Sequence, residues 1–221
     1  MAGQQDILTS VELFGRWGSL RPLAIGRDSA SIYSLSHDSS CELTWRQMKV
    51  GPFSSLSAFD DHVKELVSDQ YRAFFVVVTP DDQAVGWLCL MDGQEAHKSI
   101  ELGYVLYTPR LQRTTLATEA LYLVMQYAFG LGYGRLEWTC TAENERSRRA
   151  ADRLGFTFEG VLRKKWTLKG VPRDIAMYSL LKSEWPARGA ELEAWLSPSN
   201  FADGRQLSAL RQASLSATTL S

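Results

Sequence analysis

The sequence predicts a single α/β domain built from about seven strands and several amphipathic helices. The chain has 221 residues, of which 45% are hydrophobic and 22% are charged, so it is long enough to bury one full core. Short apolar runs alternate with segments in which apolar residues recur every three or four positions. No internal repeat or linker divides the chain. We therefore expect one domain over residues 11–197, an N-terminal tail at 1–10 and a peripheral C-terminal tail at 198–221.

The first part of the domain is expected to form strand structure followed by two helices. Residues 11–23 have a strand pattern that two glycines interrupt, which leaves open two short strands. Asp28 precedes a helical segment and is expected to cap it. Ser54 or Ser55 opens a second helix. Its apolar residues at helical spacing are Leu56, Phe59, Val63, Leu66 and Val67.

Three strands follow, and the third carries candidate site residues. Residues 74–78 and 84–91 are apolar strand patterns joined by a Pro-Asp-Asp turn. In the strand predicted at 99–107, simple alternation puts Glu101, Gly103, Val105 and Tyr107 on one face. The other face then carries Ile100, Leu102, Tyr104 and Leu106. Gly103 is the candidate position for a bulge in this strand.

The second half of the chain continues the alternation of helices and strands. Amphipathic periodicity and glycine stops predict a long helix, a strand, a short helix capped by Asn144, a hairpin and a terminal helix. Their expected ranges are 115–131, 135–141, 144–154, 158–168 with 175–181, and 184–196. In the C-terminal tail, only residues 201–210 have a pattern compatible with a helix.

Composition and charge exclude several classes of protein. A formal net charge of −1 argues against a protein that binds nucleic acid by broad phosphate neutralisation. The three cysteines share no metal-ligand spacing, and the three histidines are scattered, so we expect neither a metal site nor a Ser/His/Asp triad. The start lacks a basic and apolar leader pattern, and no window is long and apolar enough to span a membrane. A cytoplasmic protein is expected.

The loop before the long helix is a candidate anion site. It carries Arg110, Gln112, Arg113, Thr114 and Thr115 directly in front of the helix start. Unpaired N–H groups and the positive end of the helix dipole attract anions there, and the arginines and hydroxyls favour a phosphate-bearing ligand. The alternative is that these residues are solvated and only cap the helix.

Four segments in order resemble the GNAT acetyltransferase superfamily. They read IELGYVLYTP, LQRTTLATEALYLVMQYAF, AENERSRRAADRLGF and EGVLRKK. The branch that contains the ribosomal-protein N-terminal acetyltransferases is the most similar, and the resemblance covers roughly residues 20–185. It implies a central mixed, mostly antiparallel sheet of about seven strands flanked by helices. It also implies acetyl-CoA as cosubstrate and chemistry without a metal.

The resemblance assigns a set of residues to acetyl-CoA. The family's pyrophosphate loop follows the pattern Arg/Gln-x-x-Gly-x-Gly/Ala; Gln112 and Ala117 match it, whereas Thr115 stands where glycine is usual. The family also uses the backbone of the predicted strand 99–107 for the pantetheine arm, and an asparagine on the following short helix. The implied cofactor residues are Tyr104, Val105, Leu106, Gln112, Arg113, Thr114, Thr115, Leu116, Ala117, Thr118 and Asn144.

Two residues are candidates for proton transfer. Glu101 is the expected general base, because a carboxylate in a partly apolar cleft has its pKa raised toward neutrality. Glu137 and Glu143 are the other candidates, and a solvent-facing Glu101 without a catalytic role stays open. Many superfamily members protonate the leaving thiolate with a tyrosine where this chain has Ala151. In the branch it resembles, the residue matching Ser147 has that role; the alternative is that Ser147 only starts the helix.

These features predict an N-acetyltransferase that transfers acetyl from acetyl-CoA to a primary amine in a ternary complex. The acceptor is a small-molecule amine or a protein N-terminus, and the protein is expected to be a monomer or a homodimer. The alternative is a non-catalytic, degenerate domain of the same fold that binds acyl-CoA or a partner, for which Thr115 and Ala151 are the support. A ribosome- or RNA-associated protein has little support from the net charge.

Overall fold

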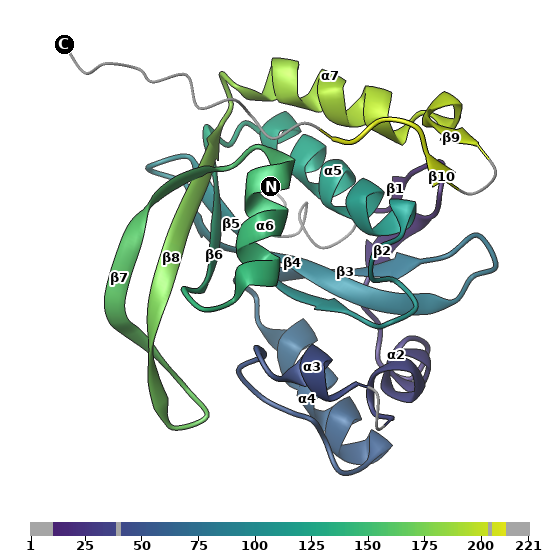
Figure 1. The fold of residues 1–221 in the computed structure, drawn as a ribbon. Coiled ribbons are helices and arrows are strands. Elements are labelled where there is room, and N and C mark those ends of the chain that lie inside the picture. Colours follow the sequence, from purple (N-terminus) through teal and green to yellow (C-terminus); the bar gives the residue numbers. More distant parts are fainter. Residues whose placement is uncertain (1–10, 39–40, 203–204, 211–221) are drawn as a thin grey trace, which may run out of the picture.

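One mixed sheet runs through the whole molecule (Figure 1). The computed structural model describes residues 11–38, 41–202 and 205–210. The sheet has eight strands in the order β1-β2-β3-β4-β5-β6-β8-β7. All neighbouring strands are antiparallel except β5 and β6, which are parallel. The predicted mixed, mostly antiparallel sheet is confirmed. It has one strand more than expected because residues 11–23 form two.

The elements follow the predicted alternation closely. The strands of the main sheet are β1 (Leu13–Phe14), β2 (Ser19–Pro22), β3 (Arg72–Val78), β4 (Ala84–Gln94), β5 (Ser99–Tyr107), β6 (Arg135–Thr141), β7 (Thr157–Leu168) and β8 (Val171–Leu181). The helices are α2 (Ser29–Ser36), α3 (Glu42–Trp45), α4 (Leu56–Ser68), α5 (Thr115–Gly130), α6 (Glu145–Leu154) and α7 (Trp185–Leu196). No helix among the described residues is long and apolar enough to cross a membrane.

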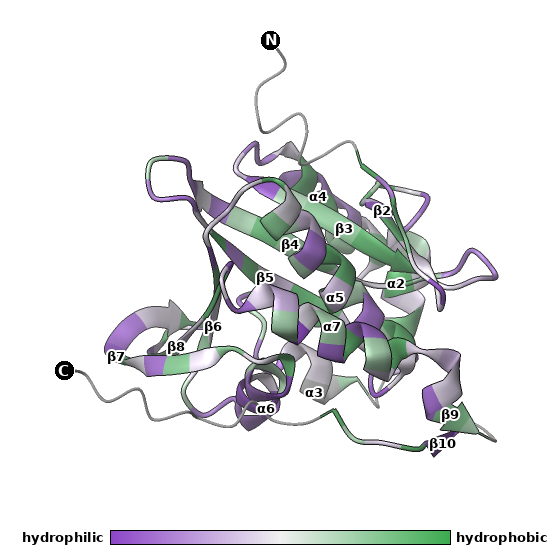
Figure 2. Cartoon of the chain, turned by 90° about the horizontal axis from the view of Figure 1, so that it is seen from above, coloured by the Kyte–Doolittle hydropathy of each residue, from purple (hydrophilic) through white to green (hydrophobic). Residues whose placement is uncertain are grey.

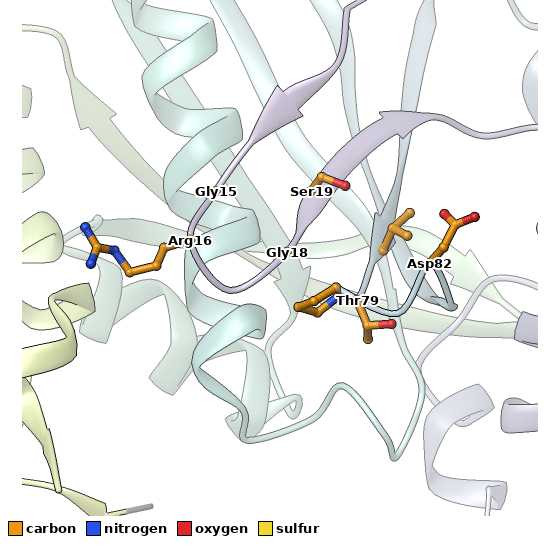
Figure 3. A pocket seen from close by; sticks show the side chains of 8 residues that line it. Gly15, Arg16, Gly18, Ser19, Thr79 and Asp82 are labelled. Carbon is orange, nitrogen blue, oxygen red and sulfur yellow. The ribbon is translucent and has the colours of Figure 1, made fainter.

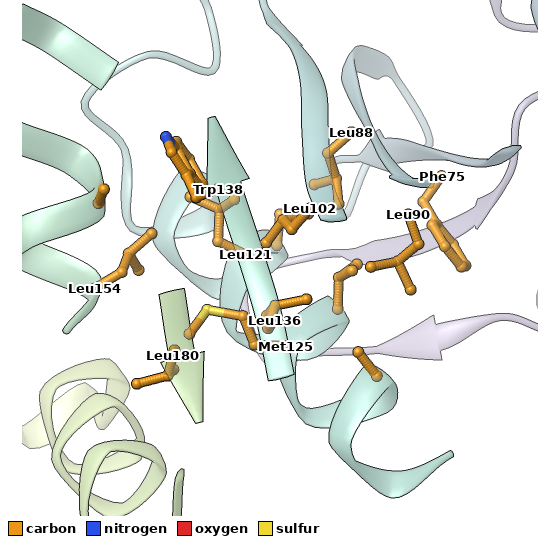
Figure 4. Packing of buried hydrophobic residues seen from close by; sticks show 14 of the residues in the cluster. Phe75, Leu88, Leu90, Leu102, Leu121, Met125, Leu136, Trp138, Leu154 and Leu180 are labelled. Carbon is orange, nitrogen blue, oxygen red and sulfur yellow. The ribbon is translucent and has the colours of Figure 1, made fainter. Parts of the chain in front are cut away.

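Helices cover both faces of the sheet, so there are two cores. Figure 1 shows α5 and α7 on one side of the sheet and α2, α3 and α4 on the other. The α5-side core includes Leu88, Leu102, Leu121, Leu136 and Trp138, whose side chains Figure 4 labels. The α4-side core includes Trp45, Phe59, Phe74, Val76 and Trp87. Figure 2 shows hydrophobic colour along the central strands β3 and β4 and hydrophilic colour over α6.

The first helices differ from the prediction in how they are capped. Asp28 does not cap α2: its carboxylate accepts hydrogen bonds from the Arg21 guanidinium at 2.7 Å and from the Ala24 N–H at 2.8 Å. Both oxygens of this fully buried carboxylate are therefore used by the chain before the helix. Ser55 does cap α4, because its side chain accepts from the Ala58 N–H at 3.2 Å. The short helix α3 was not predicted.

A bulge in β5 changes the predicted distribution of side chains. Gly103 pairs with Cys89 and Leu106 with Trp87, so β5 has one extra residue between these pairs. The left-handed conformation falls on Tyr104, whose φ is 49°, and not on Gly103. Beyond Tyr104 the side chains of β5 alternate again, but each points to the face opposite to the one that strict alternation predicts. Val105 therefore packs against the α5-side core, and the prediction that it shares a face with Glu101 is wrong.

The C-terminal region packs onto the domain through α7. Arg188 of α7 is 5% exposed and donates to the carbonyl oxygens of Arg153 and Leu154 at the end of α6. After η1 (Pro198–Asn200), a small hairpin forms from β9 (Phe201–Ala202) and β10 (Arg205–Gln206). The pattern of residues 201–210 is compatible with a helix, but Phe201–Ala202 and Arg205–Gln206 form strands there instead. The expected N-terminal tail at 1–10 and the final residues 211–221 lie outside the described residues.

Candidate active site

The parallel strands β5 and β6 separate from each other partway along their length. They pair at three positions, from Ser99 with Arg135 to Glu101 with Glu137. Among the described residues no β5–β6 pairing continues beyond Glu101, although β5 runs on to Tyr107 and β6 to Thr141. The facing backbone groups of these two strands are therefore available to a third, extended partner. We call this region the β5–β6 opening.

The β5 segment beside the opening contains three of the predicted cofactor residues. The Tyr104 side chain turns to the α4 side, where its hydroxyl lies 3.3 Å from His62 Nε2 and its ring packs edge-on against Phe74. Leu106 is buried in the same core. The side chains of Tyr104 and Leu106 are thus occupied by packing, and only the backbone of residues 104–106 is available at the opening.

The helix start next to the opening has the features of an anion site. Thr114 caps α5: its hydroxyl accepts from the Ala117 N–H at 3.1 Å and donates to the Leu111 carbonyl at 2.7 Å. Within the described residues, the N–H groups of Arg113, Thr115 and Leu116 have no hydrogen-bond acceptor. They lie at the positive end of a 16-residue helix.

The threonine that replaces the usual glycine does not strain this loop. The left-handed position falls on Arg113, whose φ is 63°, and Thr115 does not have a positive φ. A side chain at Thr115 is therefore compatible with the path of the backbone. Arg113 is exposed and has no ion-pair partner in the part of the chain that the structure describes. Its guanidinium is free to meet an anion in front of α5.

The remaining predicted loop residues have mainly structural contacts. The Gln112 side-chain amide donates to the Tyr107 carbonyl at 2.7 Å, which fixes the loop to the end of β5. Leu116 and Ala117 are buried in the α5-side core. Thr118 is 2% exposed, and its hydroxyl accepts from the Arg153 guanidinium at 3.1 Å. This last bond brings α6 to the first turns of α5.

Glu101 lies where the two strands begin to separate, and its side chain is 8% exposed. Burial raises the pKa of this carboxyl from 4.5 to about 7, mainly because the ionised form is desolvated. A hydrogen bond from the Thr139 hydroxyl to Glu101 Oε1, at 2.5 Å, acts in the opposite direction. A carboxyl with a pKa near 7 exchanges a proton readily at neutral pH.

The two alternative carboxylates are already paired with arginines. Glu137 Oε1 accepts from Arg135 Nε at 2.8 Å. Glu143 Oε1 accepts from an Arg173 guanidinium nitrogen at 2.7 Å. Among these three residues, only Glu101 combines burial with the absence of an ion-pair partner in the described structure.

The short helix α6 presents Asn144 and Ser147 to β6. Asn144 caps the helix, since its side-chain oxygen accepts from the Ser147 N–H at 3.2 Å. The Ser147 hydroxyl accepts from the Trp138 indole Nε1 at 2.9 Å. Cys140 is a further neighbour: burial raises the pKa of its thiol, and a hydrogen bond with Ser147 opposes that rise. Ser147 is half-buried, and its hydroxyl is hydrogen-bonded to a residue of β6.

The position at which the family resemblance would place a tyrosine is closed in this chain. Ala151 is 0% exposed and belongs to the α5-side core. A tyrosine there would have to displace packed neighbours, which costs more than it contributes in a dense core. Ser147 is thus the hydroxyl that α6 offers on this side of β6.

A loop and a hairpin border the Glu101 side of β6. Thr141 lies two residues beyond Thr139 on the same strand face and donates to Gln47 Oε1 at 3.0 Å. Lys169 in the β7–β8 turn donates to the Gly51 carbonyl at 2.8 Å and also to that of Trp45. These contacts hold residues 45–51 against the end of β6 and the β7–β8 turn.

A separate surface pocket lies between the β1–β2 turn and the β3–β4 turn (Figure 3). It is lined by Gly15, Arg16, Gly18 and Ser19 from the β1–β2 turn and by Val78, Thr79, Pro80 and Asp82 from the β3–β4 turn. The Glu119 carboxylate on α5 supports the first turn, because it accepts from the N–H groups of Arg16 and Trp17 at 2.7 and 2.8 Å. None of the residues that line the pocket belongs to β5, β6 or α6, so we assign no catalytic role to the pocket.

Sequence reasoning missed the residues that hold Glu101 and Ser147. Thr139 and Trp138 are consecutive on β6, and a strand directs consecutive side chains to opposite faces. An alternating pattern over 135–141 was visible in the sequence. Its register with β5 was not, and that register decides which residue meets Glu101.

Comparison with known proteins identifies relatives of this chain. Residues 19–157 match the family model described as the acetyltransferase (GNAT) domain. A GCN5-related N-acetyltransferase from Brucella melitensis has a crystal structure with a TM-score of 0.88 and 35% sequence identity. That match covers 91% of this chain and 92% of the other.

Two curated relatives are also similar. The spermidine N(1)-acetyltransferase of Escherichia coli K12 is 28% identical over 170 residues, which is 76% of this chain and 88% of that protein. The uncharacterised N-acetyltransferase YoaA of Bacillus subtilis is 35% identical over 89 residues. This second match covers 40% of the chain and spans 50% of that relative's length.

Proposed function

The chain belongs to the GNAT acetyltransferase family, and from that premise we propose that it transfers the acetyl group of acetyl-CoA to a primary amine in a ternary complex. The observation that carries the proposal is the buried Glu101 at the β5–β6 opening, with a pKa of about 7. On the other face of β6, Ser147 is held by Trp138. Glu101 and Ser147 are thus bonded to the adjacent residues Thr139 and Trp138 of β6, whose side chains project to opposite faces.

The acyl donor is positioned by backbone groups and by one arginine. The free N–H groups at the start of α5 and the Arg113 guanidinium bind the pyrophosphate. The backbone of residues 104–106 offers hydrogen bonds to the pantetheine arm in the opening, where β6 no longer pairs with β5. Asn144 borders this arm from the first turn of α6. Acetyl-CoA supplies the thioester carbonyl that reacts.

The transfer requires two proton movements. Glu101 accepts a proton from the neutral acceptor amine as the nitrogen lone pair attacks the thioester carbonyl carbon. A backbone N–H of residues 104–106 stabilises the negative charge on the carbonyl oxygen. When the carbon–sulfur bond breaks, Ser147 donates its hydroxyl proton to the thiolate and regains one from solvent. No covalent intermediate on the protein is needed.

The acceptor class is a primary amine of a small molecule or a protein N-terminus. One relative is named as a spermidine acetyltransferase, which supports including a polyamine among the first acceptors tried. The non-catalytic alternative rests on Thr115 and Ala151. It is weakened because Thr115 lies in an unstrained conformation and because a hydroxyl remains on α6.

Thiol release tests the proposal. Acetyl-CoA is mixed with the protein and with spermidine, an amino sugar or a short peptide with a free N-terminus, and free thiol is followed over time. We expect amine-dependent thiol release with at least one acceptor and intersecting initial-velocity lines when both substrates are varied. Parallel lines would indicate a covalent intermediate. Calorimetric binding of acetyl-CoA without thiol release for any amine would favour the non-catalytic alternative.

A further inference from the structure

The Glu101 carboxylate is hydrogen-bonded to a side chain that has no part in the reaction proposed above. Among the described residues, Thr139 makes the one hydrogen bond to Glu101, from Oγ1 to Oε1, at 2.5 Å. This length is typical of a hydroxyl that donates to an ionised carboxylate, which is stronger than a bond between neutral groups. Thr139 is therefore suited to hold the basic form of Glu101.

The position of Thr139 follows from how β5 and β6 separate. Glu101 is opposite Glu137 in the last pair of the parallel ladder. Thr139 is two residues further along β6, so it projects from the same face as Glu137. Backbone pairing has stopped there, and the hydroxyl reaches across the start of the opening instead. The bond joins the two strands at the point where the substrates would enter between them.

A single hydrogen bond gives the two oxygens of the Glu101 carboxylate different surroundings. Oε1 is bound to Thr139, whereas Oε2 has no hydrogen-bond partner in the described structure. We propose that Thr139 is a positioning residue: it holds Oε1 so that Oε2 of Glu101 faces the acceptor amine and receives its proton. This inference rests on the proposed role of Glu101 and adds the residue that orients it.

Other charged groups also act on Glu101 and must be kept constant in a test. Lys49, from the loop before α4, lowers the pKa of Glu101, and Asp92 of β4 and Glu137 of β6 raise it. Burial is the largest cause, and the Thr139 hydroxyl is the strongest opposing one. Removing that hydroxyl should therefore raise the pKa of Glu101 further, because the ionised form loses a donor.

The test compares the pH dependence of kcat/KM for the best amine in three variants. Thr139→Val removes the hydroxyl and keeps a β-branched side chain in the strand. Thr139→Ala removes the hydroxyl and also the β-branched shape, whereas Thr139→Ser keeps the hydroxyl. We expect the acidic limb of the profile to move up by about one pH unit in Thr139→Val and Thr139→Ala, with kcat about tenfold lower. Thr139→Ser should stay close to the wild type in both.

Glu101→Gln and the double variant Glu101→Gln/Thr139→Val separate this proposal from the one it rests on. If Glu101→Gln keeps the wild-type profile, the base is another group and the assignment of Glu101 fails. If Glu101→Gln removes the acidic limb while Thr139→Val and Thr139→Ala leave it in place, the positioning role alone is overturned. The proposal expects the double variant to be no slower than Glu101→Gln, since Thr139 acts only through Glu101.

Discussion

The Trp138 indole Nε1 donates a hydrogen bond to the Ser147 hydroxyl oxygen at 2.9 Å, and this bond joins β6 to the first turn of α6. Trp138 is 6% exposed, so its N–H has little access to water. Because the indole occupies a lone pair of the serine oxygen, the serine proton is not directed at the indole. The bond also means that Ser147 has a structural partner whether or not it is catalytic.

Ser147→Ala is expected to lower both stability and rate. The variant leaves the buried Trp138 N–H without a partner, which costs about 1–3 kcal/mol in the free energy of unfolding. Loss of the proton donor should also reduce kcat per folded molecule. That rate loss should shrink for an acetyl thioester whose thiol has a lower pKa, since such a leaving group needs less protonation. Urea titrations and kcat for the two donors measure these effects.

Trp138→Phe is the matched control for Ser147→Ala. It removes the same hydrogen bond but keeps the serine hydroxyl in place. If both variants lose stability while kcat per folded molecule stays at the wild-type value for both donors, Ser147 is only a structural part of the helix start.

Arg113→Glu should weaken acetyl-CoA binding at least tenfold, and Arg113→Ala less. The charge reversal places a carboxylate in front of the α5 N-terminus, where an anion is expected to bind. Arg163→Glu is the matched control, because Arg163 is an exposed arginine on the outer strand β7 and the change in charge is the same. Equal Kd values for all variants in calorimetry would exclude this loop as the phosphate site.

Thr115→Gly is not expected to improve the site. Thr115 does not have a positive φ, so glycine relieves no strain there. We expect acetyl-CoA affinity within about threefold of wild type and a loss of about 1 kcal/mol in unfolding free energy, because glycine lowers helix propensity at the first residue of α5. Markedly tighter binding in calorimetry would show that the threonine does obstruct the ligand.

Glu101→Gln should stabilise the protein at pH 8 and have little effect on stability at pH 4.5. The folded pKa of Glu101 is about 7, above its ordinary value of 4.5, so the folded state favours the protonated form. Its contribution to stability is fully present below pH 4.5 and is lost as the pH rises through 7. The difference at pH 8 should be on the order of 1–3 kcal/mol. Thermal melts of both proteins from pH 4.5 to 8 measure it, and parallel curves would refute the raised pKa.

Much of the fold could be predicted because local patterns determine it. Periodicity identified α4, α5 and α6, and the caps Ser55, Thr114 and Asn144 lie at or next to the predicted helix starts. These signals depend on neighbours within four residues along the chain. Residues 201–210 show the limit, since their pattern is compatible with a helix whereas residues 201–202 and 205–206 pair as a small hairpin.

Other features depend on contacts that a sequence pattern does not contain. The bulge at Tyr104 reverses the phase of β5, and strict alternation therefore put Val105 on the wrong face. Asp28 has the position of a helix cap, but the more distant Arg21 takes its carboxylate. The bond between Thr139 and Glu101 requires the parallel register of β5 and β6.

The pH–rate profile of Glu101→Gln tests the central claim most directly. For the wild type, kcat/KM for the best amine should fall as the pH drops below about 7, because protonated Glu101 cannot accept a proton. Glu101→Gln should lower kcat by roughly 10²-fold, leave the Kd for acetyl-CoA nearly unchanged and lose this acidic limb. A variant that keeps the wild-type rate and the same acidic limb would contradict the assignment of Glu101 as the general base.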